Sequence, residues 1–319
     1  MNARKHWFAI REDLSGQRSW LLGLCSFLLP LGIWSLVSYT PWIWHPMVHI
    51  SDPGGVAYFQ KDMLVEREIF NKENAFMREE GKSEARGKPA NPIYLPAPHQ
   101  VVQAFITAFQ TAPIRRNDPW LHQSILHSIT VIFYGFTLSA IFGVPLGIIC
   151  GTFAFFTRII EPFVDFIRYM PAPAFGALMV AFLGIADAPK VAIIFIGTFF
   201  QMVLVVSNTT RLLDKSLLEA AQTLGATSKK LIFHVIVPGI LPNLYRDMRI
   251  LLGWAWTYLI VAELIGASSG ISWFINQQAK YRNYDNVFAA IVMIGIIGLT
   301  TDQILRFIGH YLFPWERRN

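Results

Sequence analysis

Charged residues are missing from several long stretches of the chain, and these stretches predict membrane-spanning helices. Asp, Glu, Lys and Arg are absent from residues 19–51 and again from 119–157. A helix needs about 20 mostly apolar residues to cross the hydrocarbon core, and it satisfies its own backbone hydrogen bonds there. Glu263 interrupts the fifth such stretch and Asp302 the sixth. The pattern predicts six helices, near residues 20–43, 125–151, 162–183, 190–210, 243–266 and 287–312.

Composition agrees with this interpretation and excludes several others. Of the 319 residues, 53% are hydrophobic and 15% are charged, whereas a soluble chain carries roughly 25% charged residues. This balance excludes a soluble two-domain protein, a disordered chain and a collagen-like fibre. Cys25 and Cys150 stand in apolar runs without a nearby Cys or His, so neither a disulfide framework nor a zinc site is indicated. The sequence predicts an all-α integral membrane protein.

The first apolar stretch is predicted to be a retained helix and not a cleaved signal peptide. Basic residues in the tail, 1–19, precede it, as they do in a signal peptide. However, residues 20–44 exceed the apolar core of about 7–15 residues that a signal peptide has. The bulky sequence Tyr39-Thr40-Pro41-Trp42 also offers no small-residue cleavage site.

The placement of basic residues predicts the orientation of the spans. Short cytoplasmic loops of membrane proteins carry an excess of Lys and Arg. Here Lys and Arg gather in the tail, in residues 211–249 and at Arg317 and Arg318, which would all share one side. Both termini are therefore predicted to be cytoplasmic, and the charged segment 45–92 is predicted to be an insert on the outer side.

The outer insert, residues 45–92, is predicted to contain one amphipathic helix at 61–80, followed by a linker at 81–92 that is rich in Gly, Pro and Lys. A further short helix is predicted at 98–110. Two functions are open for the insert. It either docks an external partner or forms a small cap packed on the membrane domain, and the cap is the favoured interpretation.

A metal site in the insert is a weak hypothesis. His45, His49 and Asp52 supply suitable ligand types, but their spacing matches no metal-binding pattern. These residues are therefore predicted to be ordinary loop residues. The sequence predicts no cofactor, no bound metal and no nucleic-acid partner.

The loop 211–242 is polar for this chain, but its apolar residues keep a helical spacing. Within it, Glu219-Ala220-Ala221 is predicted to form a short helix, and Gly225 is predicted to end that helix in the left-handed conformation. Pro238 and Pro242 are predicted to break the chain before the fifth span. A long ordered loop tends to be functional. The alternative is an amphipathic helix lying on the inner membrane surface.

These residues resemble the signature of the membrane subunits of ATP-binding-cassette (ABC) importers: Glu-Ala-Ala, three residues, Gly, nine residues, then Ile-x-Leu-Pro. Val235 and Val237 replace the Ile and the Leu. Residues 168–175, 262–271 and 287–302 resemble segments of the nitrate/sulfonate/taurine-type permeases within that family. The resemblance covers residues 15–44 and 93–316, so the outer insert lies outside it.

The resemblance implies a fold of the type I ABC importer permease kind, with six transmembrane helices and a five-helix core over 93–316. It implies that the loop 211–242 docks on a separate cytoplasmic ABC ATPase, present in two copies. It also implies an extracytoplasmic solute-binding protein, a second copy of this chain and a place in the bacterial cytoplasmic (inner) membrane. The cargo expected from the resemblance is a small anion such as nitrate, a sulfonate or taurine. The implied coupling residues are Glu219, Ala220, Ala221, Gly225 and Pro238.

Two other classes compete with this interpretation. A membrane-embedded enzyme would need a catalytic constellation, and no His-Glu-x-x-His is present. An ion-coupled secondary transporter would need an internal repeat, and it would leave the loop 211–242 unexplained. No Gly-x-x-x-x-Gly-Lys-Ser/Thr sequence occurs, so ATP hydrolysis is expected in a partner and the chain itself is not predicted to be an enzyme.

Polar and helix-breaking residues inside the spans are the candidates for the transport pathway. Tyr169, Met170, Pro171 and Pro173 are predicted to bend or unwind the third span, and transporters tend to place sites at broken helices. Glu263 either lines the pathway or gate, or hydrogen-bonds structurally to the Ser268–Ser269 loop at the outer end of its helix. The structural role is favoured, because an anion pathway would not accommodate a carboxylate. Asp302 is predicted to pair with Arg306, one helical turn further on.

Overall fold

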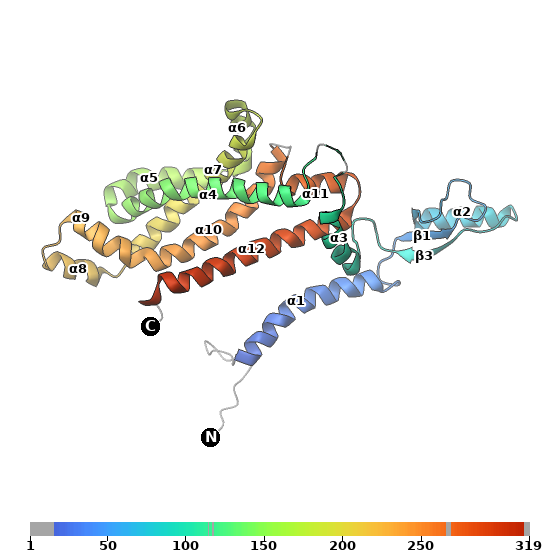
Figure 1. Ribbon diagram of the computed structural model, residues 1–319, viewed down its shortest axis with the longest axis horizontal. Helices are drawn as coiled ribbons and strands as arrows, with labels where there is room; N and C mark the ends of the chain where they lie inside the picture. Colours follow the sequence, from blue (N-terminus) through green and yellow to red (C-terminus); the bar gives the residue numbers. More distant parts are fainter. Residues whose placement is uncertain (1–15, 114, 117, 266–268, 316–319) are drawn as a thin grey trace, which may run out of the picture. The chain divides into compact units, whose positions relative to one another are not determined.

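The computed structural model describes residues 16–113, 115–116, 118–265 and 269–315 (Figure 1). The chain divides into two compact units. The first comprises the residues up to Thr107 together with Arg282–Ala289, and the second comprises Ala108–Tyr281 and the residues from Ala290 onward.

The second unit is a helical bundle. Its order begins with α4 (Leu121–Thr152), α5 (Ala154–Arg168), the 3₁₀ turn η1 (Ala172–Phe175), α6 (Gly176–Leu183) and α7 (Asp187–Arg211). It continues with α8 (Lys215–Thr223), α9 (Ser228–Lys230), the π-helical turn η2 (Leu231–Ile236), α10 (Val237–Ile265), α11 (Ile271–Lys280) and most of α12 (Tyr284–Leu312). Five helices of the described chain are long and apolar enough to cross a membrane, and a bent pair makes a sixth if it is counted as one span. The six predicted spans are therefore confirmed, with changes at two of them.

The core of the bundle is the contact between α4 and α7. Small residues recur at every fourth position of α4, at Gly135, Ser139, Gly143, Gly147 and Gly151. They face α7 residues with the same spacing, namely Ile194, Thr198, Met202, Val206 and Thr210. A stripe of small residues lets two helix backbones approach closely in a membrane. Buried residues of α10 and α11, among them Ala255, Leu259, Ala262 and Ile271, complete the main core cluster.

The third span differs from the single helix predicted at 162–183. The helix α5 starts earlier, at Ala154, and ends at Arg168, and the segment η1–α6 leaves it at an angle of 86°. The bend predicted from Pro171 and Pro173 is confirmed. Proline has no backbone N–H, and it disfavours helical geometry at the residue before it. Pro171 and Pro173, which are separated by a single residue, therefore end the helix.

The predicted break before the fifth span is wrong. The chain is helical without interruption from Ser228 to Ile265, a length of 38 residues, with Pro242 inside α10. At the end of η2 the Val237 N–H donates to the Ile232 carbonyl, which is the i to i−5 pattern of a π turn. Such a turn shifts the hydrogen-bond ladder by one residue, so Pro238, which has no N–H, fits directly after it.

The first unit contains α1 (Gly16–Tyr39) and a small αβ insert that the all-α prediction missed. Strands β1 (Met47–Asp52), β2 (Leu64–Glu66) and β3 (Arg86–Ala90) form an antiparallel sheet in the order β2-β1-β3. The helix α2 (Arg67–Glu79) is shorter than the predicted 61–80, because residues 64–66 belong to β2. Pro89 lies on the edge strand β3, the position in a sheet that tolerates proline. The insert has its own core of Ile50, Val56, Phe59, Val65, Met77 and Ala85.

The helix α3 (Pro98–Gln110) has the predicted bounds. Within the first unit, its residues Val101 and Ala104 pack with Ala289 at the start of α12, and Trp34 of α1 stacks on Phe288 with 5.6 Å between ring centroids. The Trp34 indole N–H also donates to the Pro96 carbonyl at 3.1 Å. The short helix therefore anchors the first membrane-spanning helix to the start of the last one.

The α4–α7 contact predicts the effect of adding single methyl groups. A Cβ at Gly147 would lie 2.6 Å from Val206 Cβ and 2.8 Å from the Val203 carbonyl oxygen, which is backbone and cannot turn aside. We expect Gly147→Ala to destabilise the protein by about 1–3 kcal/mol through overpacking. The thermal unfolding midpoint of the purified protein in detergent measures this effect.

Two matched variants control for the change from glycine to alanine. At Gly143 the neighbour is the flexible Met202 side chain, so Gly143→Ala should cost less. At Gly253 nothing lies within 4 Å of the added atom, so Gly253→Ala should not lower the midpoint. Equal midpoints for the Gly147 and Gly253 variants would contradict the close packing of α4 on α7.

Candidate functional site

The motif residues form the helix α8 in the loop between α7 and α10. Asp214 caps its start, because its side chain accepts a hydrogen bond from the Ser216 N–H at 2.9 Å, and this bond lowers the pKa of the Asp214 carboxyl. Gly225 follows the helix with φ of +79°, the left-handed conformation predicted for it. The Ala226 N–H donates to the Ala221 carbonyl at 3.0 Å and closes the last turn. The short helix is thus fixed at both ends.

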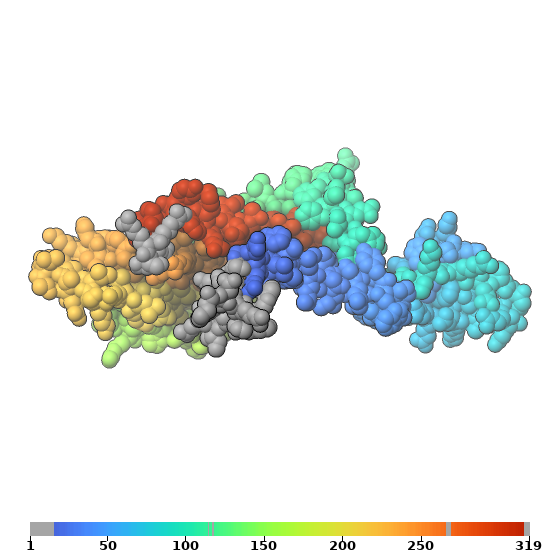
Figure 2. Space-filling view, turned by 90° about the horizontal axis from the view of Figure 1, so that it is seen from below, coloured from blue at the N-terminus to red at the C-terminus, as the bar shows by residue number. Residues whose placement is uncertain are grey.

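The surface around α8 is apolar and open to solvent. None of the α8 residues is buried, and Glu219 and Ala220 are exposed. The helical spacing of the apolar residues in this loop predicts ordered structure, but it does not predict that they are exposed. Figure 2 shows this part of the chain, in yellow to orange, on the outside at one end of the second unit. These exposed residues are Leu212, Leu217, Leu224 and Phe233.

The structure connects α8 directly to a membrane span. The helix packs against η2, which continues into α10. Gly239 in the first turn of α10 also lies against Leu213, since a Cβ there would be 2.8 Å from the leucine Cδ1. Pro238 sits in the same turn, on the exposed side. The segment that carries α8 therefore contacts the start of the fifth span directly.

Polar contacts cluster at the end of α5, directly before the bend in the third span. The Arg168 guanidinium donates to Asp165 at 2.6 Å and to the Tyr169 hydroxyl at 3.0 Å, and its carbon lies 4.6 Å from the Tyr169 ring centroid. Tyr169 itself is exposed, and so is Met170. After the bend, η1 packs against α7 and α10, with Ala172 buried in the main core. Polar contacts thus precede the bend, and packing on the core follows it.

Glu263 lies near the opposite end of α10 from α8 and is fully buried. Its carboxylate accepts hydrogen bonds from the Ser128 hydroxyl of α4 and, at 2.8 Å, from the Ser272 backbone N–H at the start of α11. Gly270, with φ of +111°, leaves room for this carboxylate where any other residue would place a Cβ. A carboxylate at a helix N-terminus is stabilised by the free N–H groups and the helix dipole. Glu263 therefore caps α11 and joins α4, α10 and α11.

A second polar cluster surrounds the buried Lys190 near Glu263, and it was not predicted from the sequence. Lys190, which is only 1% exposed, approaches Asp187 Oδ1 at 2.9 Å, Ser269 Oγ at 3.0 Å and His127 Nε2 at 3.3 Å through its Nζ atom. His127 Nε2 lies 3.1 Å from the same Asp187 oxygen. The cluster joins α4 and α7 to the segment before α11. Ser268, which the sequence analysis placed near Glu263, lies outside the described residues.

The predicted ion pair between Asp302 and Arg306 is wrong. Asp302 instead binds Arg249 of α10, which donates to both carboxylate oxygens at 2.8 Å. A two-pronged guanidinium–carboxylate pair has better geometry than an i, i+4 pair on one helix. The contact therefore joins α10 to α12, and sequence spacing alone could not show it.

The metal hypothesis for the insert finds no support in the described residues. No group of three or more His, Cys, Asp and Glu side chains there is placed to hold a metal ion. His45 is buried and donates from Nε2 to the Ser38 carbonyl at 3.2 Å, and His49 lies 3.8 Å from Asp62. The side chains of His45 and His49 thus have partners other than Asp52.

Several long apolar spans joined by buried polar contacts define a multi-span membrane protein, and a broken span is typical of transporters. The family model for binding-protein-dependent transport system inner membrane components matches residues 143–317. The chain therefore belongs to this family, and it is the inner-membrane permease subunit of an ABC importer, a transport protein and not in itself an enzyme.

Individual relatives agree with this assignment. The chain is 31% identical over 226 residues to the taurine transport system permease protein of Escherichia coli, covering 71% of this chain and 82% of the relative. It is 25% identical over 232 residues to the nitrate import permease protein of Synechocystis, covering 70% and 82%. The fold is similar to that of the methionine ABC transporter MetNI in inward-facing conformations, with a TM-score of 0.53 and 19% identity over 60% of this chain and 94% of that chain.

The capping role of Glu263 predicts a loss of stability when its carboxylate is removed. Glu263→Ala leaves the Ser272 N–H and the Ser128 hydroxyl without their acceptor, and a buried unpaired donor costs about 1–3 kcal/mol. We expect a lower thermal unfolding midpoint for Glu263→Ala and a smaller decrease for Glu263→Gln, which keeps one acceptor oxygen. The exposed Glu219 supplies the control, because Glu219→Ala should leave the midpoint unchanged. An unchanged midpoint for Glu263→Ala would refute the capping role.

Proposed function

We propose that this permease transports a small solute bearing a sulfonate group or a comparable oxyanion. The support comes from the relatives, whose names refer to taurine, aliphatic sulfonates and nitrate. All of these solutes carry a compact anionic group with several oxygen acceptors. The solute is selected by an extracytoplasmic binding protein, so calorimetry of that partner with taurine, a short alkanesulfonate and nitrate is the direct test of the substrate class.

We propose further that α8 is the coupling helix through which a separate ABC ATPase drives transport. The exposed apolar surface around α8 supports this assignment, because exposed patches of large apolar residues on soluble surfaces mark interaction sites. Ala220 and Ala221 give the helix a face that a partner can approach closely, and Glu219 adds a charge beside them. ATP-driven movement of the partner displaces α8, and η2 and α10 pass the displacement into the membrane.

In this proposal the assembly contains two copies of the permease around one pathway and two copies of the ATPase. Both termini and α8 face the cytoplasm, and the insert at 45–92 lies on the outer side as a unit separate from the permease core at 93–316. The bent segment with Tyr169, Met170, Pro171 and Pro173 contributes to the pathway, since exposed side chains lie at an 86° break in a span. Glu263 holds neighbouring helices together next to the gate and does not bind the anion, because its carboxylate already accepts hydrogen bonds.

The coupling assignment is tested by a pair of isosteric substitutions at Gly225. Asn and Asp both tolerate the left-handed conformation and have the same size, and nothing lies within 4 Å of a Cβ at this position. Gly225→Asp adds a charge to the proposed contact and should reduce ATP-dependent solute uptake into proteoliposomes at least tenfold. Gly225→Asn should retain most of the uptake.

Glu219→Lys provides an independent variant, because it reverses the charge on the same face of α8. It should also reduce uptake strongly while membrane insertion and the thermal unfolding midpoint stay at the wild-type values. Wild-type uptake by both Gly225→Asp and Glu219→Lys would rule out α8 as the coupling helix.

A further inference from the structure

A basic cavity lies between α10 and α12 in the second unit, away from Glu263 and the bend. It has a volume of about 460 Å³, and among the described residues that line it none is acidic. Its lining includes Pro242, Gly309 and Tyr245, and the Tyr245 hydroxyl donates to the Leu305 carbonyl at 2.6 Å. Its basic lining residues are Arg246, Arg249, Arg306 and His310.

Arg246 and Arg306 add positive charge to the cavity beside Arg249, which is paired with an acidic residue. Asp302 binds the Arg249 guanidinium with both of its oxygens. The nearby Asp247 accepts a hydrogen bond from Thr209 of α7. The Arg306 side chain is exposed and belongs both to this cavity and to a neighbouring hollow of about 520 Å³. An anion that enters the cavity from this neighbouring hollow would therefore contact the Arg306 guanidinium.

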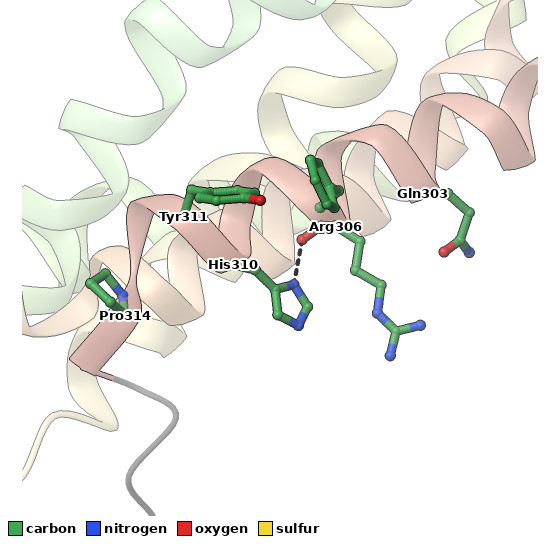
Figure 3. A pocket seen from close by; sticks show the side chains of 6 residues that line it. Gln303, Arg306, His310, Tyr311 and Pro314 are labelled. Carbon is green, nitrogen blue, oxygen red and sulfur yellow. Dashed lines mark hydrogen bonds between the residues drawn. The ribbon is translucent and has the colours of Figure 1, made fainter. Parts of the chain in front are cut away.

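His310 lies on the same side of α12 as Arg306. Its Nδ1 lies 2.7 Å from the Arg306 carbonyl, which can only accept, so Nδ1 carries the hydrogen and donates to that carbonyl. Figure 3 shows that Gln303, Arg306 and His310 project from one side of α12. The donors that this side offers to an anion are therefore the Arg306 guanidinium and the Gln303 amide.

Aromatic and aliphatic residues surround these polar groups. Phe307 and Tyr311 line the neighbouring hollow and are strongly exposed, and Phe313 packs between Tyr245 and Trp315 with 5.5 Å between ring centroids on each side. Tyr and Trp are enriched where a span meets the lipid headgroups. Basic groups beside exposed apolar side chains at the end of a span match a molecule with an anionic head and an apolar tail.

We propose that this cavity binds the phosphate headgroup of an anionic phospholipid, with Arg246 and Arg306 around the phosphate and the acyl chains along Phe307 and Tyr311. The cavity lies at the α8 end of the bundle, because α10 begins there directly after η2. The leaflet follows from the proposed function: if α8 is cytoplasmic, the lipid belongs to the inner leaflet. The binding itself does not depend on that orientation.

The test uses the full-length permease in nanodiscs of phosphatidylglycerol and phosphatidylcholine, followed by native mass spectrometry of the retained lipid. Phosphatidylglycerol should be retained in preference to phosphatidylcholine. Each basic residue near an anionic lipid contributes a factor of about five to binding, so Arg246→Gln with Arg306→Gln should reduce retention about 25-fold. Arg158→Gln is the matched control, since Arg158 is an exposed basic residue of α5 outside the cavity.

Three outcomes would overturn the proposal. The first is equal retention by the double variant and by Arg158→Gln, and the second is equal retention of phosphatidylcholine. The third is complete displacement of the lipid by millimolar inorganic phosphate, which would identify a site for the free ion. Nanodiscs expose both leaflets and the readout involves no uptake, so each result is independent of whether α8 couples the ATPase.

Discussion

The close contact between α4 and α7 is the constraint on which the rest of the bundle depends. Small residues at every fourth position of α4 bring the two backbones together, and no larger side chain fits at Gly147 without moving the backbone of α7. The remaining helices are placed relative to this pair. The helix α10 packs on α7, α5 lies against α4 and α7, and α11 is held by a carboxylate of α10 and a serine of α4.

Polar contacts occur at both ends of this pair, and they join the ends of neighbouring helices. At one end, Lys190, His127 and Asp187 join the starts of α4 and α7, and Glu263 caps α11 beside them. At the other end, Glu161 of α5 accepts hydrogen bonds from Ser207 and Arg211 of α7. Polar groups in such places must be paired inside the protein, because lipid offers no partners. These contacts fix the helix ends, and the buried hydrogen bond between Ser139 and Thr198 joins the same two helices midway along their length.

Much of this architecture could be predicted from the sequence, for clear reasons. Gaps between charges predict spans because charges are costly in lipid, and the two prolines at 171 and 173 predict the bend because of their backbone chemistry. Gly225 predicts the end of α8 because glycine tolerates positive φ. The sequence could not reveal contacts between distant segments. Lys190 looks like a loop charge until Asp187, His127 and Ser269 surround it, and Asp302 finds its partner 53 residues away.

The uninterrupted helix from Ser228 to Ile265 has a mechanical consequence. At 1.5 Å per residue its 38 residues form a rod of about 57 Å, longer than the hydrocarbon core of a bilayer is thick. One end of the rod adjoins α8, the proposed contact with the ATPase. The other end carries Glu263, whose carboxylate caps α11. In the proposed mechanism, because no loop interrupts this helix, a movement of α8 at one membrane surface would also move the other end of α10, with the contact to α7 as the pivot.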